Sequence, residues 1–359
     1  KEINEAGGVL GRPFQLIVRE TNLRPDVALR VVQQMVDDGA EFIVGTISSG
    51  VAQAISGFAK ENKVIFIDTI AQASGTTAEA GHRYVFRTSS DTVIVGRASA
   101  KVMAQRPETR YATIGPDYAF GHDAVDDFLD KLKELKPDVQ VVNQLWPSLL
   151  NPDYTSFITT ILQDEPEVVY TSLWGGDLIN FIKQALPFGF FAQTTLVAYN
   201  MDLDVLQALG SALPEGIVAA SGFPWYSLTE PSVKQFVDNY FDATGEFPVV
   251  GSLLGYNSMY ALKAAIEKAG TTETEAVVDA LAGLTWNTPL EALTLRSLDH
   301  QANPTVYVGT TKQSEDFKFL YGGVRAIVAP TFPILADLVA VPGSETILSE
   351  AEVRARRGQ

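Results

Sequence analysis

The chain has 359 residues, 27 of them basic and 43 acidic, which gives a formal net charge of −16 at pH 7. This length suggests two domains, and the 46% apolar and 19% charged residues are typical of a globular protein. An acidic surface repels nucleic acid and anionic membranes, so we expect neither as a partner. The absence of cysteine excludes disulfides, thiolate metal sites and cysteine nucleophiles.

The sequence contains no apolar run near the roughly 20 residues needed to cross a bilayer, so we expect no membrane insertion. The opening residues Lys1–Gly8 read as the polar end of a helix and not as an export signal. We therefore expect a first strand, part of the first helix and an export signal to lie upstream of this chain.

Strand-like and helix-like segments alternate along the chain. The predicted strands are residues 14–18, 41–45, 63–68, 111–115, 139–142, 167–170, 195–199 and 216–220. The predicted helices open at Pro25 and Trp174 and cover residues 51–60, 91–105, 119–135 and 154–162. Short apolar strands separated by amphipathic helices indicate parallel sheets that are covered on both faces. The pattern restarts at Gly115-Pro116, which indicates a second α/β lobe.

Three helices then follow one another without an intervening strand, at residues 232–244, 252–269 and 273–281. Because they do not continue the second sheet, we expect them to pack against the first one. The apolar, proline-interrupted residues after 330 have no predicted place.

Motifs for catalysis and cofactors are missing. His82, His122 and His300 are far apart in the sequence, so a zinc hydrolase is not expected. Val51 stands where a P-loop would have its lysine, and no GxGxxG or GxSxG motif is present. We therefore expect no cofactor and no metal. Carboxylates that meet only in the folded chain leave an enzyme open as an alternative.

Polar residues follow two neighbouring strands of the first predicted sheet. Thr46–Gly50 joins a buried strand to a helix, where serine hydroxyls and free N–H groups suit a carboxylate. Simple helix capping is the alternative role of these serines. Residues 68–77 follow the next strand and are expected beside this turn, at the carboxyl edge of the sheet.

Aromatic residues follow the strands of the second lobe. Tyr118 and Phe120 follow one strand, Trp174 and Tyr199 follow two others, and residues 223–226 follow the last. The set favours a surface for an apolar or planar ligand, while core packing is the alternative for each of them.

These residues carry a family resemblance. Ile3–Pro13 resembles the end of the first helix in type I periplasmic binding proteins, and more narrowly in the leucine/isoleucine/valine-binding branch, the solute receptors of ABC importers. Further segments resemble that branch in order: 45–49, 118–121, 151–154, 165–170 and 255–257. The resemblance covers residues 1 to about 325.

The resemblance implies two Rossmann-like lobes joined by a three-segment hinge, with a ligand bound between them by hinge closure. Lobe 1 would comprise residues 1–116 and 221–299, and lobe 2 residues 117–220 and 300–330. Residues 331–359 form an unplaced C-terminal tail.

The resemblance also implies the ligand-binding residues. The ligand carboxylate would lie at Ser48, Ser49, Ala71 and Gln72, with aromatic contacts from Tyr118, Phe120 and Trp174, and Tyr256 is a further candidate. Where relatives have an acidic partner for the ligand's ammonium group, this chain has Tyr199 or Asn200, with Asp202 and Asp204 nearby. A buried ammonium group without a partner is costly, so an aromatic carboxylate is favoured over a simple amino acid.

The resemblance therefore implies a periplasmic, non-enzymatic receptor that captures a small carboxylate-bearing solute and delivers it to the membrane subunits of an ABC transporter. A ligand-sensing domain of a receptor or regulator with the same fold is the alternative. A doubly wound enzyme is the third and least favoured reading.

Overall fold

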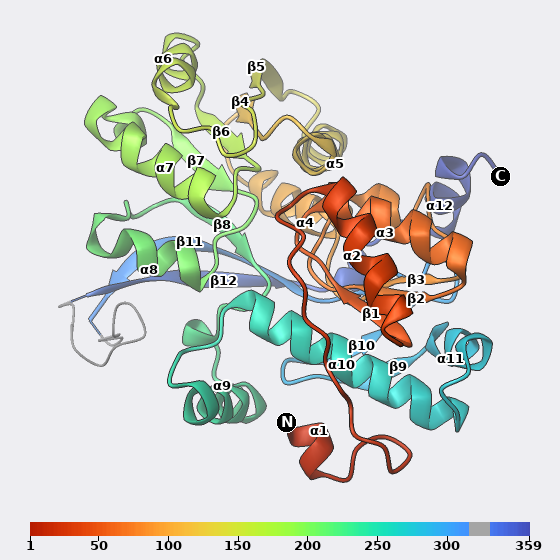
Figure 1. Cartoon of the computed structure of the whole chain (residues 1–359). Helices are drawn as coiled ribbons and strands as arrows, with labels where there is room; N and C mark the ends of the chain where they lie inside the picture. The colour runs from red at the N-terminus through yellow and green to blue at the C-terminus, as the bar shows by residue number, and fades with distance from the viewer. Residues whose placement is uncertain (316–330) are drawn as a thin grey trace. The chain divides into compact units, whose positions relative to one another are not determined.

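The structure is a computed structural model that describes residues 1–315 and 331–359. Chain contacts divide it into two compact units, each formed by separate stretches of the sequence. Unit 1 comprises Lys1–Asp91, Gly251–Pro304 and Leu348–Gln359, and unit 2 comprises Thr92–Val250 and Thr305–Ile347. Each unit has its own sheet flanked by helices (Figure 1), which confirms the predicted α/β class.

The main sheet of unit 1 has three parallel strands in the order β1-β2-β3. The strands are β1 (Phe42–Gly45), β2 (Ile65–Asp68) and β3 (Val85–Arg87), and the helices that cover them are α2 (Pro25–Asp37), α3 (Ser49–Asn62), α10 (Val250–Ala269) and α11 (Thr274–Leu281). The smaller elements of this unit are α1 (Glu2–Glu5), η1 (Ser74–Thr76), β9 (Thr285–Asn287), β10 (Ala292–Thr294) and α12 (Glu350–Arg356).

Alternation along the strands builds two apolar layers in unit 1. Phe66 packs with residues of α2 and α3, whereas its neighbours Ile65 and Ile67 pack with residues of α10 and α11. Successive side chains of a strand point to opposite faces, so a strand that is buried on both sides must be apolar throughout. All four residues of β2 are accordingly buried.

Unit 2 is built on a seven-stranded sheet in the order β12-β11-β8-β7-β6-β4-β5. Its strands are β4 (Arg110–Ile114), β5 (Gln140–Leu145), β6 (Val168–Thr171), β7 (Thr195–Ala198), β8 (Val218–Ser221), β11 (Val306–Ser314) and β12 (Phe332–Val341). The strands from β5 to β8 are parallel, while β11 is antiparallel to both of its neighbours.

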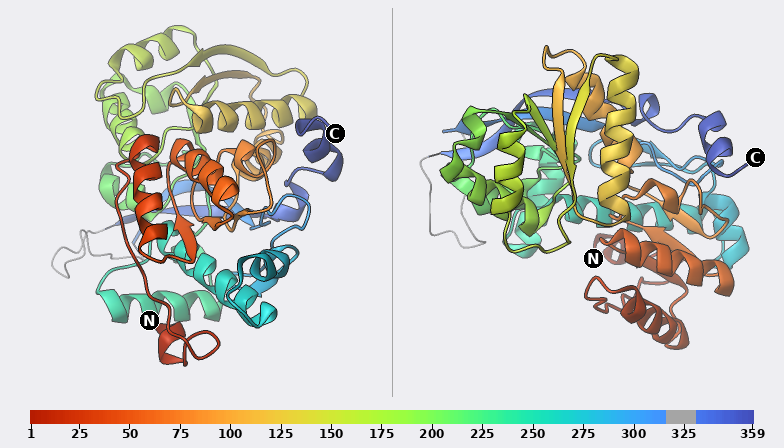
Figure 2. Two further views of the ribbon diagram at one scale, coloured as in Figure 1. Left: turned by 45° about the vertical axis from the view of Figure 1, so that its right-hand side comes forward. Right: turned by 90° about the horizontal axis from the view of Figure 1, so that it is seen from above.

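Helices cover both faces of this sheet, with α5 on one face and α6 and α7 on the other (Figure 2). The helices of unit 2 are α4 (Thr92–Met103), α5 (Ala119–Leu135), α6 (Thr155–Gln163), α7 (Gly175–Ala185), α8 (Leu203–Leu209) and α9 (Pro231–Thr244), and its short 3₁₀ turns are η2 (Leu186–Phe188), η3 (Phe190–Ala192), η4 (Gly210–Ala212), η5 (Trp225–Ser227) and η7 (Gly343–Glu345). The rings of Phe128 on α5 and Tyr170 on β6 stack with centroids 3.8 Å apart.

Helices α4 and α5 pack closely because one of them has a glycine at the contact. A Cβ atom on Gly96 of α4 would lie 2.9 Å from the backbone nitrogen of Phe128. Such an approach is closer than a real side chain tolerates, so only glycine allows the two backbones to meet here.

The predicted strand at residues 14–18 is wrong. This segment pairs with no strand of residues 1–315 and 331–359, and its Leu16 and Val18 are 71% and 76% exposed. Its alternating apolar residues therefore have no layer to pack against. It is fixed instead by the Asn4 amide, which exchanges two hydrogen bonds of 2.8 Å with the backbone of Phe14.

The predicted unit boundaries also differ from the structure. Helix α4, expected in the first lobe, belongs to unit 2, because its apolar residues enter the same core as those of α5. Helix α9, also expected on the first sheet, belongs to unit 2 as well. Its Phe236 packs against Phe223, which follows β8, with ring centroids 5.8 Å apart.

The C-terminal residues that the sequence leaves unplaced are divided by the structure. Strand β12 pairs with β11 at one edge of the unit 2 sheet, and residues 348–359 with α12 belong to unit 1. The part of the expected second lobe at residues 316–330 lies outside the described residues. Among the helices of the described chain, none has the length and hydropathy to cross a membrane.

We predict that Gly96→Ala lowers the free energy of unfolding by about 1–3 kcal/mol, because the added methyl group forces α4 and α5 apart. Gly57→Ala is the matched control, since Gly57 is an exposed position of α3 with no atom within 4 Å of its Cβ site. It should gain about 0.5–1 kcal/mol from helix propensity. Urea unfolding of both variants measures this, and equal effects would contradict the close contact.

Candidate functional site

Residues 46–50, here called the serine turn, follow β1 and include the first two residues of α3. Ser48 is the N-cap residue of α3, yet its side chain makes no capping hydrogen bond. The first N–H groups of a helix have no partner within the helix, and the first hydrogen bond here is the one from Ala52 N to Ser48 O. The Ser48 hydroxyl therefore makes no capping bond and the first N–H groups of α3 have no acceptor within the helix, while Ser48 itself is only 6% exposed.

The β2–β3 loop, residues 69–84, lies beside the serine turn, as the order of the strands predicts. The backbone N–H of Ala71 donates to Thr46 O at 2.9 Å, and that of Ala73 donates to Ser49 Oγ at 3.1 Å. Ser49 is thus a structural link between turn and loop. Ala71 and Gln72 are held next to the start of α3.

Gln72 extends this arrangement to the third strand. Its side-chain amide donates to Ser90 Oγ, which follows β3, at 2.8 Å. The carboxyl ends of three adjacent parallel strands are thereby joined by hydrogen bonds. This is the edge at which open α/β sheets bind ligands.

A buried ion pair lies behind the loop. Arg87 Nε donates to Asp68 Oδ2 at 3.1 Å, and both side chains are fully buried. Asp68 Oδ1 also accepts from Ala71 N at 3.1 Å. Burial raises the pKa of the Asp68 carboxyl, and the adjacent Arg87 opposes that rise.

Tyr256 is placed differently from the other unit 1 candidates. It stacks on Tyr260 with ring centroids 4.3 Å apart, and Tyr260 donates to Glu2 Oε2 at 3.1 Å. None of the hydrogen bonds that join the serine turn to the β2–β3 loop involves Tyr256. Its role in ligand binding stays a prediction.

The aromatic residues of unit 2 form one contiguous group, here called the aromatic edge: Tyr118, Phe120, Trp174 and Tyr199. Trp174 Nε1 donates to the Tyr118 hydroxyl at 3.1 Å. The ring of Phe120 lies 5.9 Å from that of Tyr118 and meets that of Tyr199 edge-on at 5.1 Å. Side chains that follow three strands thus contact one another, and their role in ligand binding stays a prediction.

Exposure divides this group. Phe120 and Tyr199 are only 6% and 1% exposed and belong to the unit 2 core, whereas Tyr118 and Trp174 are partly exposed and pack against that core. Burial raises the pKa of Tyr118 to about 12, so its hydroxyl stays protonated at neutral pH. Tyr118 and Trp174 are therefore the members with surface to offer a ligand. Phe223, Trp225 and Tyr226, the other aromatic set, are buried core residues.

Trp146 is a further partly exposed aromatic residue near Tyr118 and Trp174, and it was not identified from the sequence. It follows β5, is partly exposed and packs on the same core as Tyr118 and Trp174. A Cβ on Gly115 would lie 3.2 Å from its ring, and the ring of His122 stacks on it at 3.9 Å. The signal was partly available, because Trp146 follows the strand predicted at residues 139–142, but only the observed β5, which extends to Leu145, places it directly at a strand end.

Asp202 does not offer its carboxylate to a ligand. It is 3% exposed, its Oδ1 accepts from Ser221 Oγ at 2.5 Å, and its Oδ2 accepts from Asn200 Nδ2 at 2.7 Å. Burial raises the pKa of this carboxyl to about 7, and the nearby Asp204 adds to the rise. Within residues 1–315 and 331–359, no three His, Asp or Glu side chains gather as metal ligands.

The raised pKa of Asp202 predicts a pH-dependent stability. An unfolded aspartate titrates near pH ~3.9, so the folded chain binds more protons from about pH 4 to about 7 and loses stability as pH rises through that window. Asp202→Asn removes the titrating carboxyl and with it this loss of stability. The free energy of unfolding of the variant, relative to wild type, should therefore increase from pH 5 to 7 and then level off in urea titrations; a constant difference would contradict it.

Comparison with known proteins identifies the family. The sequence model of a family described as periplasmic binding protein matches residues 1–316. Leu/Ile/Val-binding protein homolog 4 of Brucella abortus is 26% identical over 330 residues, covering 87% of this chain and 78% of the relative.

Solved structures agree with this match. A periplasmic binding protein from Burkholderia mallei is 21% identical with a TM-score of 0.87, covering 98% of this chain and 90% of that one. A solute-binding protein of an ABC transporter from Rhodopseudomonas palustris BisB5, in complex with 3,4-dihydroxybenzoic acid, is 22% identical with a TM-score of 0.81, covering 93% and 88%. The chain belongs to the periplasmic binding protein family, with the type I fold, in its leucine/isoleucine/valine-binding branch.

Proposed function

We propose that this chain is the extracytoplasmic solute receptor of an ABC importer and captures a small carboxylate-bearing solute without catalysing a reaction. Members of its family are binding proteins rather than enzymes. The Brucella abortus relative is named for binding Leu, Ile and Val, and the Rhodopseudomonas palustris protein binds 3,4-dihydroxybenzoic acid. Both named ligand classes carry a carboxylate.

The observation that carries the proposal is the uncommitted hydroxyl of Ser48. A serine at the start of a helix normally caps it, and Ser48 does not. Its hydroxyl lies next to the N–H groups that open α3, where the helix dipole favours a negative charge. The Gln72 residue of the β2–β3 loop is held beside this position by its bond to Ser90. A carboxylate satisfies all of these donors together.

The state of Asp202 favours an aromatic carboxylate over a free amino acid. An α-amino acid carries an ammonium group, which needs an acidic partner when it is taken out of water. Asp202 is buried and both of its oxygens accept hydrogen bonds from Ser221 and Asn200. A ligand without an ammonium group does not need an acidic partner.

Planar surfaces support the same preference. Trp174, Tyr118 and Trp146 are partly exposed on the core of unit 2. Aromatic rings attract other rings in stacked or edge-on geometry, beyond the area that they bury. The three side chains are therefore suited to the ring of an aromatic acid.

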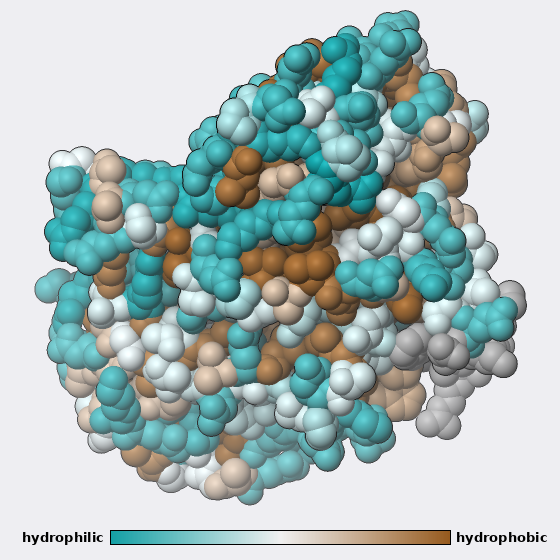
Figure 3. Space-filling model, turned by 180° about the vertical axis from the view of Figure 1, so that it is seen from behind, coloured by the Kyte–Doolittle hydropathy of each residue, from teal (hydrophilic) through white to brown (hydrophobic). Residues whose placement is uncertain are grey.

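We propose that the partner is the membrane part of an ABC transporter. The net charge of −16 favours a partner surface that presents Arg or Lys. On the face drawn in Figure 3, hydrophilic residues are spread widely over the surface, with hydrophobic residues among them. Such a mixed surface suits transient docking.

A thermal-shift screen tests the ligand class. Benzoate, 4-hydroxybenzoate and 3,4-dihydroxybenzoate should raise the melting temperature, since a ligand at 100 times its Kd adds about 2.7 kcal/mol to the folded state. Leucine, isoleucine and valine should give little or no shift. A shift with branched amino acids alone would contradict the aromatic preference, and no shift with any carboxylate would contradict the proposed function.

Ser48→Ala separates capping from binding. We expect almost no change in the free energy of unfolding, because no hydrogen bond is lost. Binding of 3,4-dihydroxybenzoate should weaken at least about tenfold, because a hydrogen bond to a charged group contributes about 1.5–3 kcal/mol. Glu273→Ala is the control, since Glu273 caps α11 through two backbone N–H groups. It should lose about 0.5–1 kcal/mol of stability and keep its affinity. Calorimetric titration and urea unfolding measure both; the reverse pattern would assign Ser48 a structural role.

A further inference from the structure

The β2–β3 loop carries Ala71 and Gln72 but has little regular structure of its own. Its only helical element is the single turn η1. A loop that orders only when a ligand arrives loses about 1–2 kcal/mol per residue in backbone entropy. Strong binding by this loop therefore requires contacts that fix it beforehand.

Two arginines at the end of α12, the C-terminal helix of unit 1, supply such contacts: Arg356 is its last residue and Arg357 is its C-cap residue. Arg357 donates from Nε to Ala78 O at 2.8 Å and from Nη2 to Thr77 O at 2.9 Å. Arg356 Nη1 donates to Ser74 Oγ at 3.0 Å. The helix thus contacts the loop at three residues that closely follow Gln72 in the sequence.

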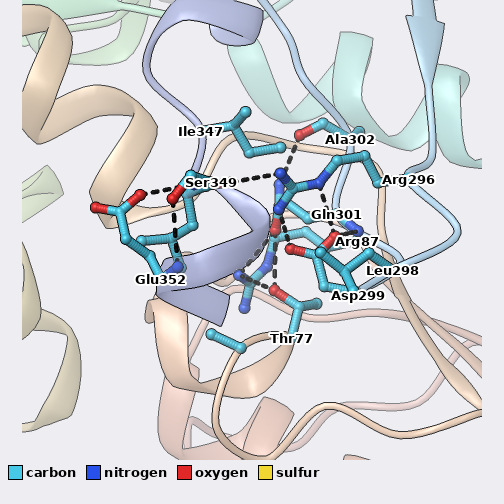
Figure 4. Close-up of polar contacts among 12 residues, drawn as sticks. Thr77, Arg87, Arg296, Leu298, Asp299, Gln301, Ala302, Ile347, Ser349 and Glu352 are labelled. Atoms are coloured by element: carbon cyan, nitrogen blue, oxygen red, sulfur yellow. Dashed lines mark hydrogen bonds and ion pairs between the residues drawn. The ribbon is translucent and has the colours of Figure 1, made fainter. Parts of the chain in front are cut away.

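Helix α12 is itself firmly placed. Ser349 and Glu352 form a capping box at its start (Figure 4), and Val353 is fully buried. Arg296, which is paired with Asp299, donates to Leu348 O just before the helix. Arg356 and Arg357 therefore extend from a helix that is held in place by its own contacts.

The core of unit 1 also holds the loop at Thr77. Arg87 Nη1 donates to Thr77 Oγ1 at 3.3 Å (Figure 4), and its Nη2 donates to Ala73 O at 2.8 Å. Thr77 is accordingly fixed by one arginine through its hydroxyl and by another through its carbonyl.

We propose that α12 is a positioning element for ligand binding: Arg356 and Arg357 hold the β2–β3 loop in its binding conformation, although the groups that they contact are not those that face the ligand. The inference rests on the proposed function for its binding readout. It assigns residues 348–359 a role in ligand binding that does not require any of them to contact the ligand.

The test compares Arg357→Ala, at the C-cap of α12, with Arg354→Ala within the helix. Arg354 pairs with Glu350 within α12 and is the matched control. We expect 3,4-dihydroxybenzoate to bind about tenfold more weakly to Arg357→Ala, since ordering of the loop then opposes binding, and with unchanged affinity to Arg354→Ala. Arg357→Lys, which keeps a donor, should recover part of the affinity.

Hydrogen exchange of the free protein supplies the second readout. Amides of residues 69–84 should exchange faster in Arg357→Ala than in wild type or Arg354→Ala. Faster exchange with unchanged affinity would overturn the positioning role, as would unchanged exchange. If the wild type binds no carboxylate at all, the proposed function fails, and the exchange comparison alone then decides whether α12 fixes the loop.

Discussion

Unit 1 depends on the buried guanidinium of Arg87. An ion pair taken out of water is stabilising only if its remaining donors and acceptors are also satisfied, and here Asp68, Gln301 and Ala73 O complete the set. The Arg87 backbone also pairs with residues 300–302, through Arg87 N to His300 O and Ala302 N to Arg87 O. One residue therefore joins β2, the β2–β3 loop and a segment more than 200 positions later in the sequence.

The two units provide different chemistry through the same kind of scaffold. In unit 1 the carboxyl ends of the strands carry hydroxyls, an amide and open N–H groups, which suit an anion. In unit 2 the corresponding ends carry rings that rest on a rigid core, including the stacked pair Phe128 and Tyr170. A parallel sheet fixes the backbone at these ends and leaves the side chains free to vary.

The sequence was sufficient to predict most strands and helices of both sheets, because their apolar periods are regular; α5 was predicted at its observed bounds, residues 119–135. It was not sufficient for residues 14–18, whose strand-like alternation has no layer to pack on, or for α9, whose place in unit 2 depends on contacts such as that of Phe236 with Phe223. At the site, spacing alone could not show that Ser49 bridges to the loop while Ser48 does not cap, or that Asp202 is enclosed. These depend on hydrogen-bond partners that only the folded chain brings together, such as Ala73 for Ser49 and Ser221 for Asp202.

The discontinuous composition of unit 1 has a kinetic consequence. Its three segments are separated by about half of the chain, so its contacts have a large average sequence separation, and such topologies fold slowly because loop closure precedes the stabilising contacts. Unit 2 also receives residues 305–347, but its parallel strands β4 to β8 are contiguous in sequence. During synthesis from the N-terminus, the strands and helices of unit 1 that are made first remain without residues 348–359 until all of unit 2 has been made.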